Sequence, residues 1–222
     1  MERFLYFGLN ELPYVLVALL IAFSVHEFSH AYVAYKLGDP TAERAGRLTL
    51  NPIAHLDPIG TLMIFFAGFG WAKPVPVNLF ILRDKRFAGV YISLAGPLSN
   101  LVIATLTLGL GYLLIGTGVL DAISATRYYD PVINLINIII NLNLMLFVFN
   151  LLPIPPLDGY RIIEGLLPSA HRPRLRAVEM YGPFFLLLMV LTPLGDYFFS
   201  GVFYPFKELI LTGLNNFYQL FF

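Results

Sequence analysis

Residues 12–37 read LPYVLVALLIAFSVHEFSHAYVAYKL, a continuous apolar stretch that is interrupted by charge only in its second half. At about 1.5 Å per residue, a helix of this length crosses the roughly 30 Å hydrocarbon core of a bilayer. Pro13 stands in the first turn, where a missing N–H has no cost, and Gly38-Asp39-Pro40 ends the run. The leader before it is not basic, which argues against a cleaved signal peptide. We therefore predict a retained membrane-spanning helix.

The composition supports a membrane protein throughout. Of the 222 residues, 58% are hydrophobic and 13% are charged, whereas about a quarter of a soluble domain is charged. Mean hydropathy is +0.73. The net charge is zero, and no basic cluster interleaved with aromatic residues is present, so nucleic acid is not an expected partner. The absence of cysteine leaves His, Asp and Glu as the expected metal ligands.

Further apolar runs predict more membrane helices. Three of them are long enough to span: 88–117, 131–152 and about 180–200. The run at 59–70 is too short, so residues 59–78 are expected to enter the membrane and return. The role of 201–222 stays open between an interfacial helix and an extra span. We predict one membrane-embedded domain over 1–222: an all-α polytopic fold with about four to six membrane helices and a short re-entrant or β-hairpin loop around 59–78.

The basic residues indicate the orientation. Most of the fourteen Lys and Arg residues lie in the segments 36–87 and 158–179. Cytoplasmic loops carry an excess of such residues, so both segments are expected on the cytoplasmic side. The first helix then enters from outside, and polar groups in its inner half are reached from the cytoplasm.

The pentapeptide His26-Glu27-Phe28-Ser29-His30 carries the chemistry. An H-E-x-x-H on a helix places two imidazoles on one face, with a glutamate beside them, which is the arrangement of a zinc hydrolase. An ionisable residue at the bilayer centre costs about 2.5–3.5 kcal/mol on insertion scales. A polar contact between helices explains a lone histidine, but it accounts poorly for three ionisable groups at ligand spacing. We therefore predict catalytic zinc at His26 and His30.

A catalytic zinc needs a third protein ligand, for which Asp158 is the best candidate. It follows an apolar helix and the prolines at 153, 155 and 156, which stop that helix and force extended backbone. Gly159 lets this backbone approach a partner closely. The alternative is that Asp158 is an ordinary N-cap of a helix that begins near Tyr160.

His55 and Asp57 are rival ligands in the loop that surrounds them. Both stand beside prolines in a polar segment, where Asn-Pro and Asp-Pro pairs are typical of turns. A hydrogen-bonding role within the loop is therefore favoured for both. His171 lies in a basic loop and is expected to be solvated.

These motifs together resemble the site-2 protease family of intramembrane zinc metalloproteases. The resemblance extends over nearly the whole chain and rests on His26–His30, on Asn150 eight residues before Asp158-Gly159, and on the segments 46–52, 70–78 and 95–100. It is strongest to the short prokaryotic branch without an inserted PDZ domain, and implies a prokaryotic cell membrane. The resemblance implies one zinc per chain on His26, His30 and Asp158, with Glu27 as general base. It also implies that Asn150 contacts the substrate carbonyl or its oxyanion; the alternative is interhelical hydrogen bonding.

The expected function is a zinc-dependent endopeptidase that cleaves transmembrane segments. A helix cannot be cut while its carbonyls are hydrogen bonded, so single-span proteins with helix-weakening residues are the expected partners, besides the lipid bilayer. The Pro74–Pro76 alternation suggests that residues 73–78 offer one free strand edge to an unwound substrate. Two other functions stay open: a membrane zinc hydrolase of a non-peptide bond, and a non-catalytic metal-binding protein. The substrate and oligomeric state are not readable from the sequence.

Overall fold

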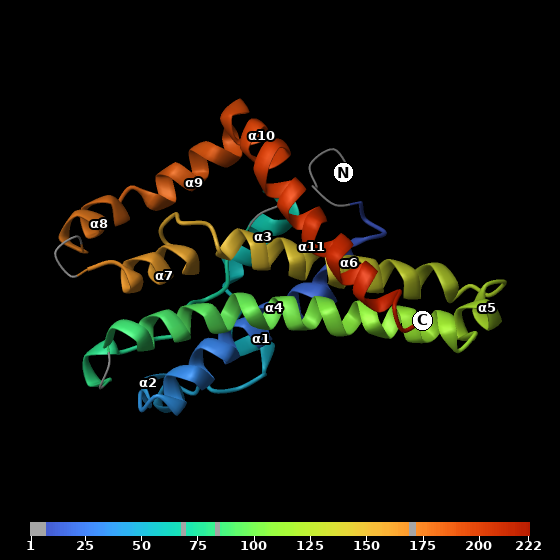
Figure 1. Cartoon of the computed structure of the whole chain (residues 1–222), viewed down its shortest axis with the longest axis horizontal. Helices are drawn as coiled ribbons and strands as arrows, with labels where there is room; N and C mark the ends of the chain where they lie inside the picture. The colour runs from blue at the N-terminus through green and yellow to red at the C-terminus, as the bar shows by residue number, and fades with distance from the viewer. Residues whose placement is uncertain (1–7, 68–69, 83–84, 169–171) are drawn as a thin grey trace.

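Three long helices organise the computed structural model, which describes residues 8–67, 70–82, 85–168 and 172–222 (Figure 1). They are α1 (Leu12–Lys36), α4 (Lys85–Gly116) and α6 (Tyr129–Asn150). Within the described residues, only these three contain a stretch long and apolar enough to cross a membrane. The predicted all-helical membrane fold is confirmed, and the first, second and third predicted spans correspond to these helices.

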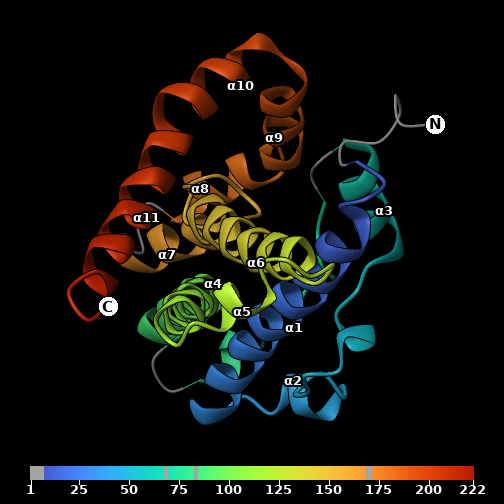
Figure 2. The same cartoon turned by 90° about the vertical axis from the view of Figure 1, so that its right-hand side faces the viewer.

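The three long helices pack against one another and form the centre of the molecule. Figure 2 looks nearly along α4 and α6, with α1 beside both. Val15, Leu19 and Phe23 of α1 are buried against apolar side chains of α6. Ala104 of α4 is buried against Ile140 and Leu144 of α6, and its small side chain permits the close helix contact that membrane bundles favour.

The connection between α1 and α4 is built from short elements. It contains α2 (Thr41–Arg44), a 3-10 turn (Pro52–Ala54), α3 (Pro58–Ala67) and a second 3-10 turn (Leu79–Ile81). Between α3 and the second turn the described chain is extended, and its one β-type pairing joins Leu56 and Ala72. Of the two forms expected around 59–78, the described residues therefore show a short helix with an extended return, not a β-hairpin. Pro74 and Pro76 lack the N–H groups that a hairpin ladder needs.

A tight turn connects α6 to the next helix and places it close to the end of α6. The chain passes through a cis Pro155–Pro156 bond and then enters α7 (Asp158–Leu166). A Cβ atom on Gly159 would lie 2.2 Å from the carbonyl oxygen of Leu151. Gly159 therefore permits the close backbone approach that was expected of it.

The C-terminal third differs from the predicted fourth span. In place of one helix over 180–200, α9 (Gly182–Leu191) and α10 (Pro193–Phe198) are separated at Thr192, whose backbone is extended. Pro193 is the cause, because a proline disfavours helical backbone in the residue before it. This part also contains α8 (Arg172–Glu179) and a π-helical turn (Phe199–Phe203). A further short helix, α5 (Val119–Ile123), lies between α4 and α6.

The last helix, α11 (Tyr204–Tyr218), packs against the bundle. In Figure 2, α9, α10 and α11 form an arch that returns to α4 and α6. The Tyr218 hydroxyl donates to Thr105 O of α4 at 2.9 Å, and Lys207 Nζ donates to Asn141 Oδ1 of α6 at 2.9 Å. The tail left open by the sequence is thus a helix bound to both long helices.

Candidate metal centre

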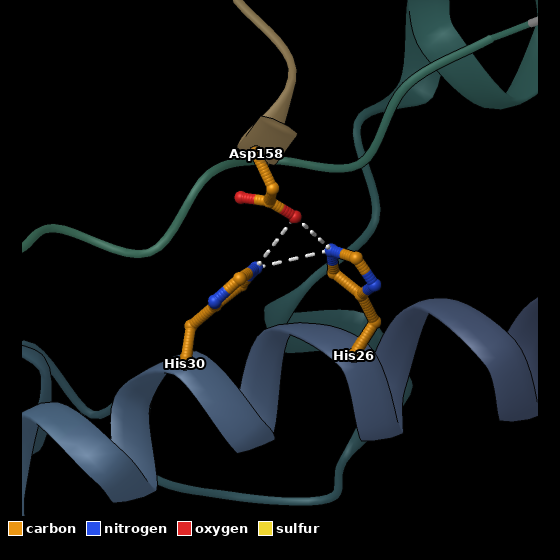
Figure 3. Close-up of side chains that lie close together, drawn as sticks. All are labelled: His26, His30 and Asp158. Carbon is orange, nitrogen blue, oxygen red and sulfur yellow. Dashed lines mark hydrogen bonds and ion pairs between the residues drawn. The ribbon is translucent and has the colours of Figure 1, made fainter. Parts of the chain in front are cut away.

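The two histidines of the H-E-x-x-H motif and Asp158 meet at one point. His26 and His30 lie four residues apart on α1, and their Nε2 atoms are 3.0 Å from each other. Asp158 is the first residue of α7, and its Oδ2 lies 3.2 Å from His26 Nε2 and 3.3 Å from His30 Nε2. Figure 3 shows both imidazoles projecting from α1 toward this carboxylate. The three expected ligands are therefore brought together from segments far apart in the sequence.

The far side of the His30 ring determines which nitrogen faces the cluster. His30 Nδ1 lies 2.6 Å from the backbone carbonyl oxygen of Ile92, which can only accept a hydrogen bond. Nδ1 therefore carries the proton, and in a neutral imidazole Nε2 then presents a lone pair. The Nδ1 atom of His26 has a corresponding partner, Asn100 Oδ1, at 2.6 Å.

When both rings are neutral, the cluster consists of acceptors that have no proton to share. Asp158 Oδ2 is buried and has no hydrogen-bond donor, and it faces Nε2 lone pairs at close range. Three such groups repel one another unless a cation lies between them. Two imidazole nitrogens and one carboxylate oxygen are also the ligand set of many catalytic zinc sites. The residues present therefore fit a zinc ion.

Gly96 of α4 provides the space for that ion. A Cβ atom at this position would lie 2.3 Å from His30 Nε2 and 2.6 Å from His26 Nε2, against the two ligand atoms themselves. Any other residue would fill the place between the rings. The glycine is thus required by the site, not by the backbone conformation of α4.

Asp158 is ionised in this setting. Burial raises the pKa of its carboxyl group, but the imidazoles of His30 and His26, when they carry a second proton, lower it by more, to about 2. The N-cap position of α7 is Leu157, and Asp158 is the first residue inside the helix. The alternative N-cap role is therefore wrong, and the carboxylate is the form that a metal ion meets.

Glu27 lies beside His26 on α1 and is 8% exposed. Its Oε2 accepts a hydrogen bond from the main-chain N–H of Val75 at 2.9 Å. The carboxylate of Glu27 thus contacts the extended segment after α3. His26 and His30, which carry the two imidazoles, lie on the same helix as Glu27.

Asn150 is the last residue of α6, at the start of the turn that leads to Asp158. Its side chain is half-buried, and its Nδ2 donates to Leu146 O one turn back in the same helix, at 2.9 Å. The structure therefore places Asn150 near the turn that carries Asp158 but outside the group of three ligand atoms.

The rival ligands take part in loop structure. His55 is fully buried and its Nε2 lies 2.7 Å from Thr49 O. Asp57 Oδ1 accepts from the N–H of Gly60 at 2.8 Å, in the first turn of α3. Neither residue belongs to the cluster formed among the described residues. The expected loop-stabilising role is confirmed for both; His171 lies outside the described residues.

Arg47 joins this loop to the extended segment. Its guanidinium group is buried and donates to the carbonyl oxygens of Lys73, at 2.5 Å, and Pro74, at 3.2 Å. One of its nitrogens also lies 3.4 Å from His55 Nδ1. A planar guanidinium with several donors is suited to hold two carbonyls at once. Arg47 therefore fixes the start of the segment that contacts Glu27.

The edge of 73–78 that was expected to be free is largely occupied, because three of its four N–H groups are already hydrogen bonded. The N–H groups of three of its residues donate to neighbouring oxygens: Lys73 to His55 O, Val75 to Glu27 Oε2 and Asn78 to Asp39 Oδ2. Buried N–H groups need partners, and here the protein supplies them itself. The prediction of an open strand edge for substrate is wrong for this conformation.

Three positioning features were not assigned from the sequence. Ile92, Gly96 and Asn100 follow one another at intervals of four along α4. Ile92 contacts His30, Asn100 contacts His26, and Gly96 lies against both rings. Asn143 of α6 contacts Asn100 from behind. The spacing of 92, 96 and 100 places these residues on one helix face, and the sequence shows this spacing. It does not show that the two histidines of α1 pack against that face.

Comparison with known proteins agrees with this geometry. Residues 14–191 match the family model described as Peptidase family M50. A Bacillus subtilis (strain 168) protein named "Putative zinc metalloprotease YwhC" is 50% identical over 197 residues, covering 89% of each chain. Two proteins named "Putative zinc metalloprotease Rip2" have lower sequence identity to this chain. The Mycolicibacterium smegmatis protein is 31% identical over 86% of this chain and 72% of its own. The Mycobacterium tuberculosis H37Rv protein is 33% identical over 91% and 75%.

No solved structure matched the chain. The family match covers all three long helices and both halves of the candidate metal centre, from the H-E-x-x-H motif to Asp158. The relatives are named for the same metal and the same chemistry that the ligand set fits. The chain belongs to peptidase family M50, the site-2 protease family, and is a zinc metallopeptidase.

Proposed function

We propose that this metallopeptidase cleaves transmembrane segments of membrane-tethered proteins within the bilayer, with His26, His30 and Asp158 as the zinc ligands. The observation that carries the proposal is the position of the cluster on α1. His26 and His30 lie well inside a helix that is long and apolar enough to span. A hydrolytic centre at that depth faces substrates that are themselves in the membrane.

Glu27 is assigned the role of general base. A zinc ion bound at the cluster supplies polarisation of the scissile carbonyl and a lowered pKa of water. Glu27 takes the proton from the attacking water and later delivers it to the leaving amine. Its support is its place next to His26 and its burial, which excludes bulk water from the carboxylate.

Asn150 is assigned to the substrate carbonyl or its oxyanion. An amide N–H aimed at developing negative charge is a common source of transition-state stabilisation. In the structure this amide donates to Leu146 O at 2.9 Å. Because the amide nitrogen carries two hydrogens, Asn150 can keep this bond and donate its second N–H to the substrate.

The substrates assigned are single-span proteins with helix-weakening residues near the cytoplasmic end of the span. A helical segment keeps its carbonyls in hydrogen bonds, so it has to unwind before attack. The concentration of basic residues in 36–87 and 158–179 supports access from the cytoplasmic side of a prokaryotic cell membrane. Membership of a peptidase family sets aside the non-peptide hydrolase and the non-catalytic metal-binding protein as functions.

The test is co-expression of the wild type and Glu27→Gln with candidate single-span proteins, followed by mapping of any cut. Cleavage inside the transmembrane segment is expected with the wild type only, while both proteins retain zinc. Cleavage confined to extramembrane loops contradicts the intramembrane assignment. Equal cleavage by Glu27→Gln contradicts the role of Glu27.

A further inference from the structure

Two asparagines lie fully buried between the long helices, behind the metal centre. Asn100 of α4 and Asn143 of α6 have no exposed surface, and both lie within helices that can span the membrane. Burying an amide without hydrogen bonds costs about 1–3 kcal/mol in proteins. Such a pair therefore needs a set of partners that satisfies it.

Two backbone carbonyls fix the orientation of these amides. Asn143 Nδ2 donates to Ile139 O at 2.9 Å, which turns Asn143 Oδ1 toward Asn100. Asn100 Nδ2 donates to that oxygen at 2.9 Å and to Ala22 O of α1 at 3.4 Å. A carbonyl oxygen can only accept, so neither amide can be reversed without facing an acceptor with an acceptor.

This series of hydrogen bonds ends at His26. With its nitrogen committed to Asn143 and Ala22, Asn100 presents Oδ1 to His26 Nδ1, 2.6 Å away. Nδ1 must then be the donor, and the neutral ring presents its Nε2 lone pair to His30 and Asp158. Every hydrogen bond from Ile139 O to the metal centre thus points in one direction.

We propose that Asn143 and Asn100 form a positioning relay that fixes the tautomer and ring orientation of His26 as a zinc ligand. The inference rests on the proposed ligand set. Asn100 contacts the ligand directly, whereas Asn143 acts only by orienting Asn100. Partners of this kind behind metal-binding histidines typically contribute 10- to 100-fold to metal affinity.

The relay gives His26 a different support from His30. His30 depends on a backbone oxygen of α4, whereas His26 depends on side chains from both α4 and α6. The same helix α6 leads through the following turn to Asp158. Two of the three ligands are therefore held in place through α6.

The test measures zinc affinity of the purified full-length protein by competition with a chelator. Asn143→Leu keeps the approximate side-chain volume but removes the acceptor that orients Asn100, so zinc should bind about 10- to 100-fold more weakly. Asn137→Leu is the matched control, because Asn137 is an exposed asparagine of the same helix; its zinc affinity should stay within twofold of wild type. Equal affinity of Asn143→Leu and wild type overturns the relay.

A second substitution separates orientation from packing. In Asn100→Asp the buried side chain is expected to be a neutral carboxyl group, which can donate its proton to Ala22 O and still turn an acceptor oxygen toward His26, so it needs no acceptor at position 143. The double variant Asn100→Asp with Asn143→Leu should therefore recover zinc affinity relative to Asn143→Leu alone. The visible absorption spectrum of the cobalt-substituted double variant should also be closer to the wild-type spectrum than that of cobalt-substituted Asn143→Leu is. Failure of the double variant to recover either property contradicts the relay and points to packing alone.

His26→Ala in the same assay separates this inference from the proposed ligand set. Loss of zinc from His26→Ala together with unchanged affinity in Asn143→Leu leaves the ligands in place and rejects the relay. Retention of full zinc affinity by His26→Ala rejects the ligand set and the relay together.

Discussion

The main-chain N–H of Val75 donates a hydrogen bond to the carboxylate of Glu27, at 2.9 Å, across 48 residues of sequence. This contact connects the extended segment after α3 to the glutamate of the H-E-x-x-H motif. The segment is itself held by Arg47 through the carbonyls of Lys73 and Pro74. The position of the proposed general base is thus set partly by a backbone group outside α1.

Removing the N–H of Val75 should slow cleavage. A hydrogen bond to a charged group contributes about 1.5–3 kcal/mol, so Val75→Pro is expected to lower kcat roughly 10- to 100-fold while zinc content stays at one ion per chain. Val77→Pro is the matched control, because the N–H of Val77 has no hydrogen-bond partner among the described residues. Comparable slowing by both variants argues for a general effect of proline on the segment.

Filling the space at Gly96 should abolish zinc binding. In Gly96→Ala the new methyl group would lie within 2.6 Å of both Nε2 atoms, a separation that real contacts do not allow, so the rings or the metal must move. Metal analysis of the purified protein should find far less than one zinc per chain. Gly111→Ala, also in α4 but with the nearest atom to its new Cβ at 3.8 Å, should bind zinc as wild type does. A full complement of zinc in Gly96→Ala contradicts the role of Gly96 in leaving space for the ion.

His55 should matter for stability and not for metal binding. Its ring fills a buried position and its Nε2 lies 2.7 Å from Thr49 O. His55→Ala removes this hydrogen bond and empties a buried position, which costs about 1–3 kcal/mol, so the unfolding temperature should fall by several degrees. Zinc stoichiometry should remain one per chain, in contrast with His26→Ala. Zinc loss from folded His55→Ala restores His55 as a ligand candidate.

Zinc should stabilise the folded protein strongly. Without a cation, two Nε2 lone pairs and the Asp158 carboxylate face one another at 3.0–3.3 Å. Free zinc at about 1,000 times its Kd contributes roughly 4 kcal/mol to the free energy of unfolding. Thermal unfolding of chelator-treated protein should therefore shift to higher temperature when zinc is returned. An unchanged unfolding temperature for wild type, or an equal shift for His26→Ala, contradicts binding at this cluster.

Local features of the sequence predicted a large part of the fold and site. The spacing of His26 and His30 places both rings on one helix face whatever the rest of the chain does. The apolar lengths of 12–37, 88–117 and 131–152 predicted the three long helices. Pro193 was an available signal for the break between α9 and α10, since the residue before a proline leaves the helical region, but the apolar run over 180–200 outweighed it.

Contacts between distant segments were the part that the sequence could not supply. The free edge expected along 73–78 is occupied by Glu27 and Asp39, because a buried N–H takes whichever acceptor the fold brings to it. Asn100 reaches His26 across 74 residues, and nothing in the local pattern around either residue specifies the other.

By itself, the sequence determined a membrane-embedded zinc site built on one helix, because helical periodicity and hydrophobic length act over a few residues at a time. Only the tertiary structure decided which atoms surround that site. It placed Gly96 against both rings, Asn100 and Asn143 behind His26, and Val75 on Glu27. The physical reason is that these partners are selected by packing between helices, and packing brings together residues whose separation along the chain carries no information about their distance in space.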